Sequence, residues 1–149
     1  MDDIGIFALE TSKDLYHKMK HDFGILTQEQ TSYTYFNFII DANHLIEWIE
    51  KDTNLSDDVI RRATTIKNLC SYKLINDMAN RGKHFIRKEY IRKQQISKDE
   101  LIPELNFDHI DFSKINFGGP VFVVEYQGEE VNLYTECQNV FKFYEQLFE

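Results

Sequence analysis

Residues 30 to 52 are apolar on two sides of a helical period, and this stretch constrains the fold more than any other. One stripe has the alternating spacing of three and four residues that is typical of a packing seam, and it comprises Tyr35, Phe38, Ala42, Leu45 and Ile49. A second stripe lies beside it and comprises Phe36, Ile40, His44 and Trp48. A helix that is apolar on two sides needs cover from both directions. The pattern therefore predicts a long central helix over residues 30 to 52.

Two further helices are indicated by capping residues. Thr11 with Asp14 resembles a capping box, in which side chains bind the free N–H groups of a first turn, and it predicts a helix over residues 11 to 26. Ser56 is a good N-cap for a helix that we expect to run from residue 57 into the 80s. Its first buried face is predicted to carry Val59, Ala63, Ile66 and Cys70.

The C-terminal part of the chain predicts a hairpin and a last helix. The Gln127-Gly128 pair is a turn signal between strands at 121 to 126 and 129 to 133, and a helix follows over 134 to 148. Residues 89 to 117 show no sustained period, and only Ser97 with Glu100 suggests one short capped turn there. We expect that stretch to be a connection that is either wrapped against the domain or partly mobile.

The length of the chain fits one domain. With 149 residues, six glycines and two prolines, it suits long regular elements better than a loop-rich sandwich. We predict a single domain over residues 1–149 that is mainly α, a four-helix up-and-down bundle with a small β-hairpin before the last helix.

Compartment is predicted from the N-terminus and the cysteines. The acidic Met-Asp-Asp start lacks the basic-then-apolar pattern of a signal peptide, and no apolar run reaches the roughly 20 residues that span a bilayer. Cys70 and Cys137 have no partner motif, as expected of reduced, buried cysteines. We expect a cytoplasmic protein that makes no membrane contact.

Charge is distributed unevenly along the chain. The net charge is −8, yet residues 61 to 93 carry ten basic and two acidic side chains, a formal charge of +8 that leaves −16 for the remainder. Such asymmetry is typical of polyanion contact. The alternative is that the basic segment neutralises acidic helices around it or in a second subunit.

A polar cluster near the end of the third predicted helix is the main candidate site. On a straight helix, Asp77, Arg81 and His84 continue the face of Ala63 and Ile66, flanked by Lys73 and Asn80. His84 is the candidate catalytic acid or base, because imidazole titrates near neutral pH. The candidate binding residues are His44, Lys73, Asp77, Asn80, Arg81 and Lys83. The alternative is a solvated helix end, and Gly82 can end or kink the helix there.

The other histidines have simpler interpretations. His44 is either a core residue or a second imidazole beside His84, and we predict that Asn80, Lys83 and His84 share a concavity near it. His17 and His21 have metal-binding spacing, but no carboxylate completes the motif, and Lys18 and Lys20 surround the pair. We therefore predict a solvent-exposed face there, and neither a metal nor a cofactor. The sequence has no phosphate-binding glycine loop, nucleophile elbow or paired-cysteine motif.

Two motifs resemble a known superfamily. The stretches 41–48 (Asp-Ala-Asn-His-Leu-Ile-Glu-Trp) and 76–84 (Asn-Asp-Met-Ala-Asn-Arg-Gly-Lys-His) are similar to those of small bacterial and phage proteins that resemble the HEPN superfamily. The resemblance implies a helical bundle, a homodimer and contact with RNA or a nucleotide. Ribonucleolytic members carry an Arg followed after four to six residues by a His, and none of the five arginines here does so.

Three functional hypotheses follow from the residues and the resemblance. The first is an RNA- or nucleotide-contacting module without the standard ribonuclease motif. The second is a metal-independent ribonuclease that uses His84. The third is a non-catalytic, partner-binding subunit of a toxin–antitoxin or defence system.

Overall fold

The computed structural model describes residues 8–83 and 122–149, and in this part the chain is mainly helical. The order of elements is α1 (Ser12–Gln28), α2 (Ser32–Lys51), α3 (Asp57–Thr64), the 3₁₀ turn η1 (Thr65–Asn68), α4 (Cys70–Lys83), β1 (Val123–Tyr126), β2 (Glu129–Asn132) and α6 (Leu133–Phe148). A two-stranded antiparallel hairpin precedes the last helix, so the predicted mainly α fold with a small hairpin is confirmed. None of the described helices is long and apolar enough to cross a membrane.

Side-chain caps define where the helices begin. Thr11 accepts from the backbone N–H of Asp14, and the Asp14 carboxylate accepts from the N–H of Thr11 in return, as the sequence predicts. Thr31 and Thr34 form the same reciprocal arrangement at the start of α2. Ser56 caps α3 by accepting from the N–H of Val59. These bonds satisfy first-turn donors that have no partner inside a helix.

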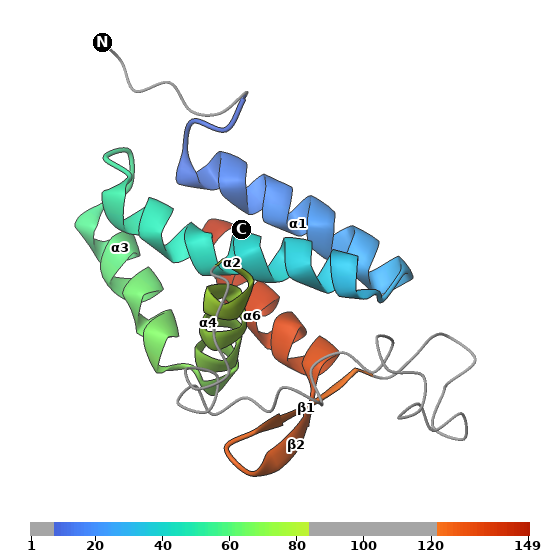
Figure 1. Cartoon of the computed structure of the whole chain (residues 1–149). Coiled ribbons are helices and arrows are strands. Elements are labelled where there is room, and N and C mark those ends of the chain that lie inside the picture. Colours follow the sequence, from blue (N-terminus) through green and yellow to red (C-terminus); the bar gives the residue numbers. More distant parts are fainter. Residues whose placement is uncertain (1–7, 84–121) are drawn as a thin grey trace.

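The core lies where α1, α2, α4 and α6 meet. α1 packs antiparallel along α2, and α6 passes behind α2 and α4 in the view of Figure 1. α6 contacts all four of the helices α1, α2, α3 and α4. The Phe23 and Phe141 rings stack with centroids 4.3 Å apart and join α1 to α6. The buried Tyr144 hydroxyl donates to the Ala42 carbonyl oxygen at 2.9 Å. The last helix therefore binds the α1–α2 pair through both aromatic packing and a buried hydrogen bond.

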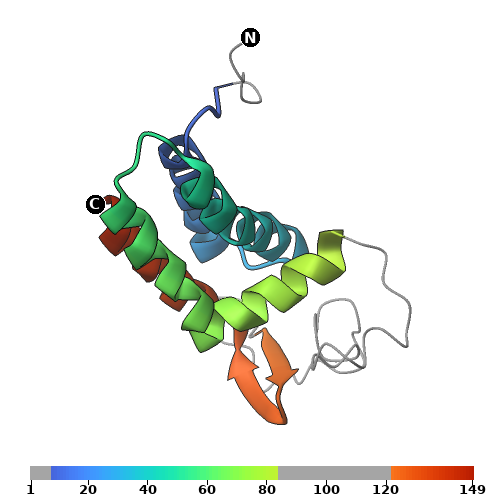
Figure 2. The ribbon, with the colours of Figure 1, turned by 90° about the vertical axis from the view of Figure 1, so that its left-hand side faces the viewer.

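The third predicted helix is broken, which corrects the expectation of one rod from residue 57 into the 80s. α3 ends at Thr64, one 3₁₀ turn follows, and Leu69 is extended before α4 starts in a new direction (Figure 2). The Thr64 and Thr65 hydroxyls donate to the carbonyl oxygens of Ile60 and Arg62. Such bonds from β-branched residues compete with regular helix geometry, and they accompany the break here.

The break changes which residues are buried. Ala63 and Ile66 are fully buried as predicted, but Val59 is only partly buried and Cys70 is exposed. The prediction that both cysteines are buried is therefore wrong for Cys70 and confirmed for Cys137. Because α4 does not continue α3, the inference that Asp77 and Arg81 lie on the face of Ala63 no longer holds.

The two stripes of α2 are covered to different extents. The first stripe is buried throughout, with Tyr35 the most exposed of its members at 3%. In the second stripe Phe36 is 50% exposed, and Ile40 and Trp48 are only partly buried. The helix is central, as predicted, but the side chains of its second stripe are only partly covered by the rest of the protein.

Candidate functional site

Lys73, Asp77 and Arg81 recur every four residues along one side of α4. Lys73 is exposed, while Asp77 and Arg81 are half-buried. Four residues advance an α-helix by little more than one turn, so the three side chains follow one another along the helix axis. α4 thus presents one carboxylate between two cations.

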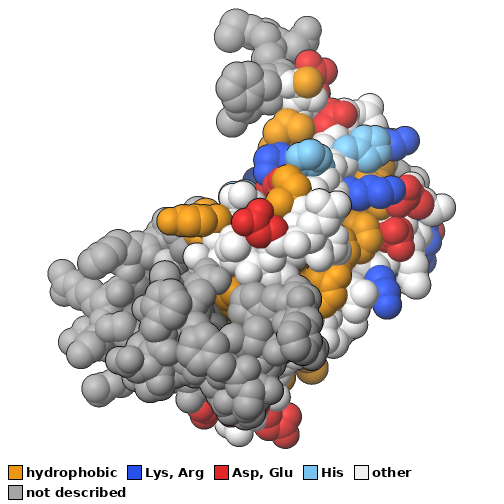
Figure 3. Space-filling model, turned by 90° about the vertical axis from the view of Figure 1, so that its right-hand side faces the viewer, with side chains coloured by type: hydrophobic (Ala, Val, Ile, Leu, Met, Phe, Trp, Pro, Cys, Tyr) orange, Lys and Arg blue, Asp and Glu red, His pale blue; other side chains and the backbone are white. Residues whose placement is uncertain are grey.

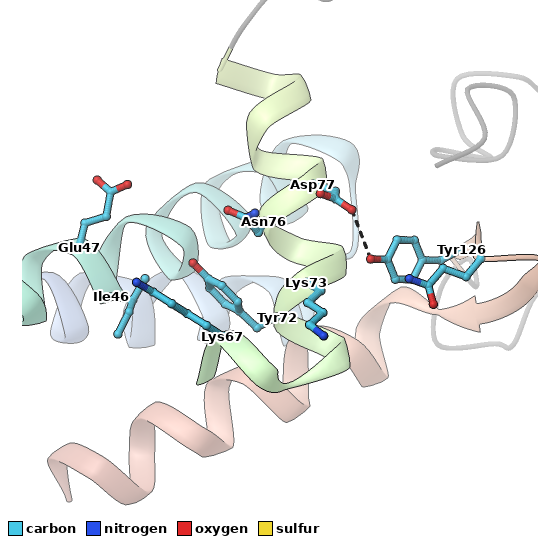
Figure 4. Close-up of a pocket in the computed structure, with 9 residues that line it drawn as sticks. Ile46, Glu47, Lys67, Tyr72, Lys73, Asn76, Asp77 and Tyr126 are labelled. Carbon is cyan, nitrogen blue, oxygen red and sulfur yellow. Dashed lines mark hydrogen bonds between the residues drawn. The ribbon is translucent and has the colours of Figure 1, made fainter. Parts of the chain in front are cut away.

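A pocket of about 510 Å³ opens beside this part of α4. Its lining comes from α2, η1, α4, β1 and the hairpin turn, and comprises Ile46, Glu47, Lys67, Tyr72, Lys73, Asn76, Asp77, Tyr126 and Gln127. Figure 4 shows Glu47, Lys67, Tyr72 and Asn76 on the α2 side of α4, and Lys73, Asp77 and Tyr126 on the side of the hairpin. The pocket combines two phenols, two amides, two carboxylates and two ammonium groups.

The hairpin brings Tyr126 against α4. Tyr126 is the last residue of β1 and pairs with Glu129 across a turn in which Gln127 and Gly128 both have positive φ, 54° and 82°. Two positive φ values in succession are typical of the type I′ turn, which suits the twist of a short hairpin. The Tyr126 hydroxyl donates to Oδ2 of Asp77 at 3.2 Å (Figure 4).

This contact changes the acidity of both groups. Burial raises the pKa of the Asp77 carboxyl, and the Tyr126 hydroxyl partly offsets that rise by donating to the carboxylate. Burial and the negative charge of Asp77 raise the pKa of Tyr126 to about 12. At neutral pH the phenol is therefore protonated and remains a donor to Asp77.

Most described cations of the basic segment are ion-paired with nearby acids. Arg61 and Arg62 both contact Asp58, at 2.6 and 3.2 Å, and Lys67 lies 2.5 Å from Glu50. For these three residues, the contacts favour neutralisation of acidic neighbours over contact with a polyanion.

Lys73 and Arg81 differ from the other cations. Neither has an ion-pair partner within the described residues. Nη1 of Arg81 is buried and has no acceptor, and burial lowers the pKa of this guanidinium. A buried donor without an acceptor costs free energy. Neither cation of the α4 row is therefore neutralised by an acid within the described residues.

The remaining predicted residues do not line this pocket. His44 and Asn80 are both half-buried, on α2 and α4 respectively, and Arg81 lies beyond the pocket lining. The Lys83 side chain and the whole of His84 lie outside the described residues, as do the predicted turn at Ser97 and the connection over 89–117. The structure brings Lys73 and Asp77 together, and the shared concavity of His84 and His44 stays a prediction.

Several pocket residues were missed by the sequence reasoning. Tyr126 and Gln127 belong to the predicted hairpin, but no local pattern indicated that the hairpin contacts α4. Tyr72, Glu47 and Lys67 also line the pocket, and none of them was among the predicted site residues. The available signal was the bulky tyrosine directly before a Gln-Gly turn, because such a ring lies close to whatever element the hairpin covers.

A second charged cluster lies between α1 and α2. Nζ of Lys18 is 2.8 Å from Oδ2 of Asp22 and 2.8 Å from Oδ1 of Asp41, whose side chain is 7% exposed. Burial and the adjacent Asp22 carboxylate raise the pKa of Asp41 to about 7, against the opposing effect of Lys18. Burial also acts on Asp22, but the neighbouring Asp41 and Lys18 hold its pKa below the usual value. Near neutral pH, therefore, Asp41 is the carboxyl group of this pair that takes up a proton, while Asp22 stays ionised.

The Lys18 cluster is internally hydrogen-bonded, and its residues do not line the pocket beside α4. We therefore regard it as a structural link between α1 and α2. Within residues 8–83 and 122–149, no group of three or more histidine, cysteine, aspartate or glutamate side chains is placed to hold a metal ion.

Comparison of the chain with protein-family models, with curated proteins and with solved structures finds no match to any of them. The likeness to the HEPN superfamily therefore rests on the two sequence motifs alone.

Proposed function

We propose that this protein contacts RNA or a nucleotide through the pocket beside α4, without cleaving it. The observation that carries the proposal is the exposed, unpaired Lys73 in a pocket that also holds Tyr126 and Asp77. A cation, an aromatic ring and a hydrogen-bond acceptor are the three groups that bind the phosphate, the face and the edge of a nucleotide. Within the basic segment, Lys73 and Arg81 have no described ion-pair partner, and their charges support the same proposal.

Binding without cleavage is favoured by the residues that line the pocket. Its described lining includes no histidine, and the chain lacks the Arg and His spacing of ribonucleolytic HEPN proteins. The ribonuclease alternative depends on His84, and no described contact adds support for it. Incubation of labelled RNA with the protein in EDTA tests this alternative, since a metal-independent ribonuclease still produces fragments there.

The binding proposal is tested with labelled RNA at a series of salt concentrations. We expect affinity to fall as salt rises, because cations that contact phosphates release counterions on binding. Lys73→Ala should weaken binding about tenfold, whereas Arg62→Ala, which removes a cation already paired with Asp58, should leave it unchanged. Equal weakening by both variants would contradict the pocket as the binding site, and no measurable binding would refute the function.

We also propose a homodimer, supported by the exposed apolar side chains near the α1–α2 turn. Tyr33 is 81%, Phe36 50% and Ile25 41% exposed. Figure 3 shows hydrophobic side chains at the surface among acidic and basic ones, on the described part of the face that it presents. Light scattering should give twice the monomer mass. Phe36→Glu should halve it, with Lys13→Glu, an exposed position at the start of α1, as the control.

A reducing, cytoplasmic setting fits the proposal, because Cys70 and Cys137 are both unpaired. The partner-binding alternative would use the same exposed side chains as the homodimer. A mass of one monomer in the light-scattering experiment would favour it over self-association.

A further inference from the structure

The row of Lys73, Asp77 and Arg81 is too long for a single phosphate group. Eight residues separate Lys73 from Arg81, which is about 12 Å along a helix that rises 1.5 Å per residue. A single phosphate group is much smaller than that separation, so we do not expect one phosphate to contact both cations. Two phosphates of one chain can do so.

Asp77 leaves both cations of the row available. It lies four residues from each of them, the spacing at which ion pairs form on helices, yet the described contact of its side chain is with the Tyr126 hydroxyl. Elsewhere in the described chain this spacing is used: Asp58 pairs with Arg62, and Asp22 with Lys18. The hairpin thus occupies the carboxylate that would otherwise neutralise Lys73 or Arg81.

Arg81 has a further reason to bind an anion. Its buried Nη1 has no acceptor, although its side chain as a whole is only half-buried. A phosphate oxygen there would supply the missing acceptor, and a guanidinium binds phosphate oxygens in a bidentate manner.

Tyr126 lies beside the middle of this row. Its ring is partly exposed, in contrast to Tyr72, which is 7% exposed and belongs to the core. The hydroxyl bond to Asp77 fixes the edge of the ring, and the free part of its face can stack on an unpaired base (Figure 4). We expect a base stacked there to direct its exocyclic amino group toward Asp77, since the carboxylate can accept a hydrogen bond from that group.

From this arrangement we infer that the ligand is single-stranded RNA rather than a free nucleotide. One base stacks on Tyr126, with phosphates on either side of it at Lys73 and Arg81. The inference rests on the proposed function and adds the class of ligand. Duplex RNA does not fit, since its bases are stacked within the helix and their faces are unavailable to a side chain.

The experiment compares four labelled probes at one salt concentration: a nucleoside monophosphate, a single-stranded tetranucleotide, a single-stranded octanucleotide and a duplex of the octanucleotide. We expect the tetranucleotide to bind at least ten times more tightly than the monophosphate. The octanucleotide should bind about as tightly as the tetranucleotide, and the duplex more weakly than either.

Variants then assign the contacts. Tyr126→Leu should weaken tetranucleotide binding by about tenfold or more, the range seen when a base loses its aromatic platform. Tyr126→Phe keeps the ring and should retain most of the affinity, so it is the matched control for the loss of the aromatic face. Lys73→Ala and Arg81→Ala should each reduce the slope of log affinity against log salt by about 0.7, the value of one single-strand phosphate contact. Circular dichroism confirms that each variant is folded.

The outcomes separate this inference from the function on which it rests. If the monophosphate binds as tightly as the tetranucleotide, the pocket takes a free nucleotide, and the inference fails while the proposed function stands. If Tyr126→Leu or Arg81→Ala binds the tetranucleotide like the unaltered protein, the path along α4 is wrong. If none of the four probes binds, both fail.

Discussion

Two charged clusters in this protein each contain a lysine and an aspartate one helical turn apart, and they differ in whether these charges are paired. Between α1 and α2, Lys18 contacts both Asp22 and Asp41 within 2.9 Å, and every charge has a partner. On α4, Asp77 lies one turn from Lys73 and from Arg81, but its described partner is a tyrosine of the hairpin.

The difference arises from the neighbouring element. The Lys18 cluster lies against α2, which supplies a second carboxylate, so the ammonium group is enclosed by acids from two helices. α4 meets the hairpin, whose Tyr126 hydroxyl donates to the Asp77 carboxylate. The hairpin supplies no carboxylate to Lys73 or Arg81 among the described contacts, so the charges of these two residues stay unpaired. Charged residues spaced by one helical turn therefore form a structural link or an available site according to what packs against them.

The largest expected effect is on the pH dependence of stability, and it concerns the paired cluster. The pKa of Asp41 is about 7 in the folded protein and 3.8 in the unfolded chain, so the folded state binds the proton more strongly. This stabilisation is complete below the unfolded pKa and is lost as pH rises through about 7. We expect the free energy of unfolding, compared between the unaltered protein and Asp41→Asn, to change by on the order of 3 kcal/mol from pH 5 to pH 8.

Urea denaturation at a series of pH values measures this effect. The contribution of Asp22 to stability has the opposite pH dependence, because the pKa of Asp22 is lowered in the folded state. Asp22 therefore stabilises the folded state above its unfolded pKa, and this stabilisation is lost only as pH falls below that value. A difference between the two proteins that stays constant with pH would show that the pKa of Asp41 is not raised in the folded state.

The next effect is the loss of the central cation. Lys18→Ala leaves the Asp22 and Asp41 carboxylates without their common partner, and should lower the free energy of unfolding by about 2 kcal/mol at pH 8. The loss should be smaller at pH 5, because a protonated Asp41 no longer needs a cation. Lys13→Ala, an exposed lysine of α1 without a described ion pair, is the matched control in the same urea titrations. An equal loss at both pH values would contradict the charge-based explanation.

A smaller effect is expected where the hairpin meets α4. Tyr126→Phe removes the hydroxyl that donates to Asp77, and should cost about 1 kcal/mol of stability, the usual net value of one hydrogen bond. Thermal unfolding measures this cost, with Tyr33→Phe as the exposed control. If Tyr126→Phe is as stable as the unaltered protein, the hydroxyl contributes nothing to the placement of the hairpin.

The smallest effect on stability should come from a substitution in the row of Lys73, Asp77 and Arg81 on α4. Arg81→Met removes a half-buried guanidinium with no acceptor at Nη1 and keeps an unbranched side chain of helix-forming type. We expect stability within about 0.5 kcal/mol of the unaltered protein, or slightly above it. A loss above about 2 kcal/mol in chemical denaturation would mean that Arg81 is structural, and it would end the contrast between the two clusters.

The sequence predicted the helices of this fold well and its long-range contacts poorly. Thr11 and Ser56 cap the helices that they were predicted to cap, because capping depends on residues within one turn of each other. The apolar stripe that includes Phe38 and Leu45 is buried, because its period describes one face of one helix.

Features that depend on distant residues were missed. Lys18 was read as part of a solvent face, and its contact with Asp41 follows only from the packing of α1 on α2. The break near Leu69 could not be seen in a pattern that remained helical on both sides of it. Tyr126 was placed in a hairpin but not in the pocket, because nothing local specifies which helix that hairpin covers.

The pocket lining spans the sequence from Ile46 to Gln127. Because the ribosome makes these residues at different times, the separation determines when the pocket can form during synthesis. α1 and α2 are local partners that can pair as soon as both have been made. The hairpin is tied to the start of α6, since the N–H of Leu133 donates to the carbonyl oxygen of Phe122 at 2.9 Å, and α6 packs on residues more than a hundred positions earlier. At the usual 5–20 residues per second, several seconds of translation separate the emergence of α2 from that of Tyr126. A nascent chain therefore exposes Lys73 and Asp77 before the ring that completes their surroundings exists, and it acquires the complete pocket only when its C-terminal helix has docked.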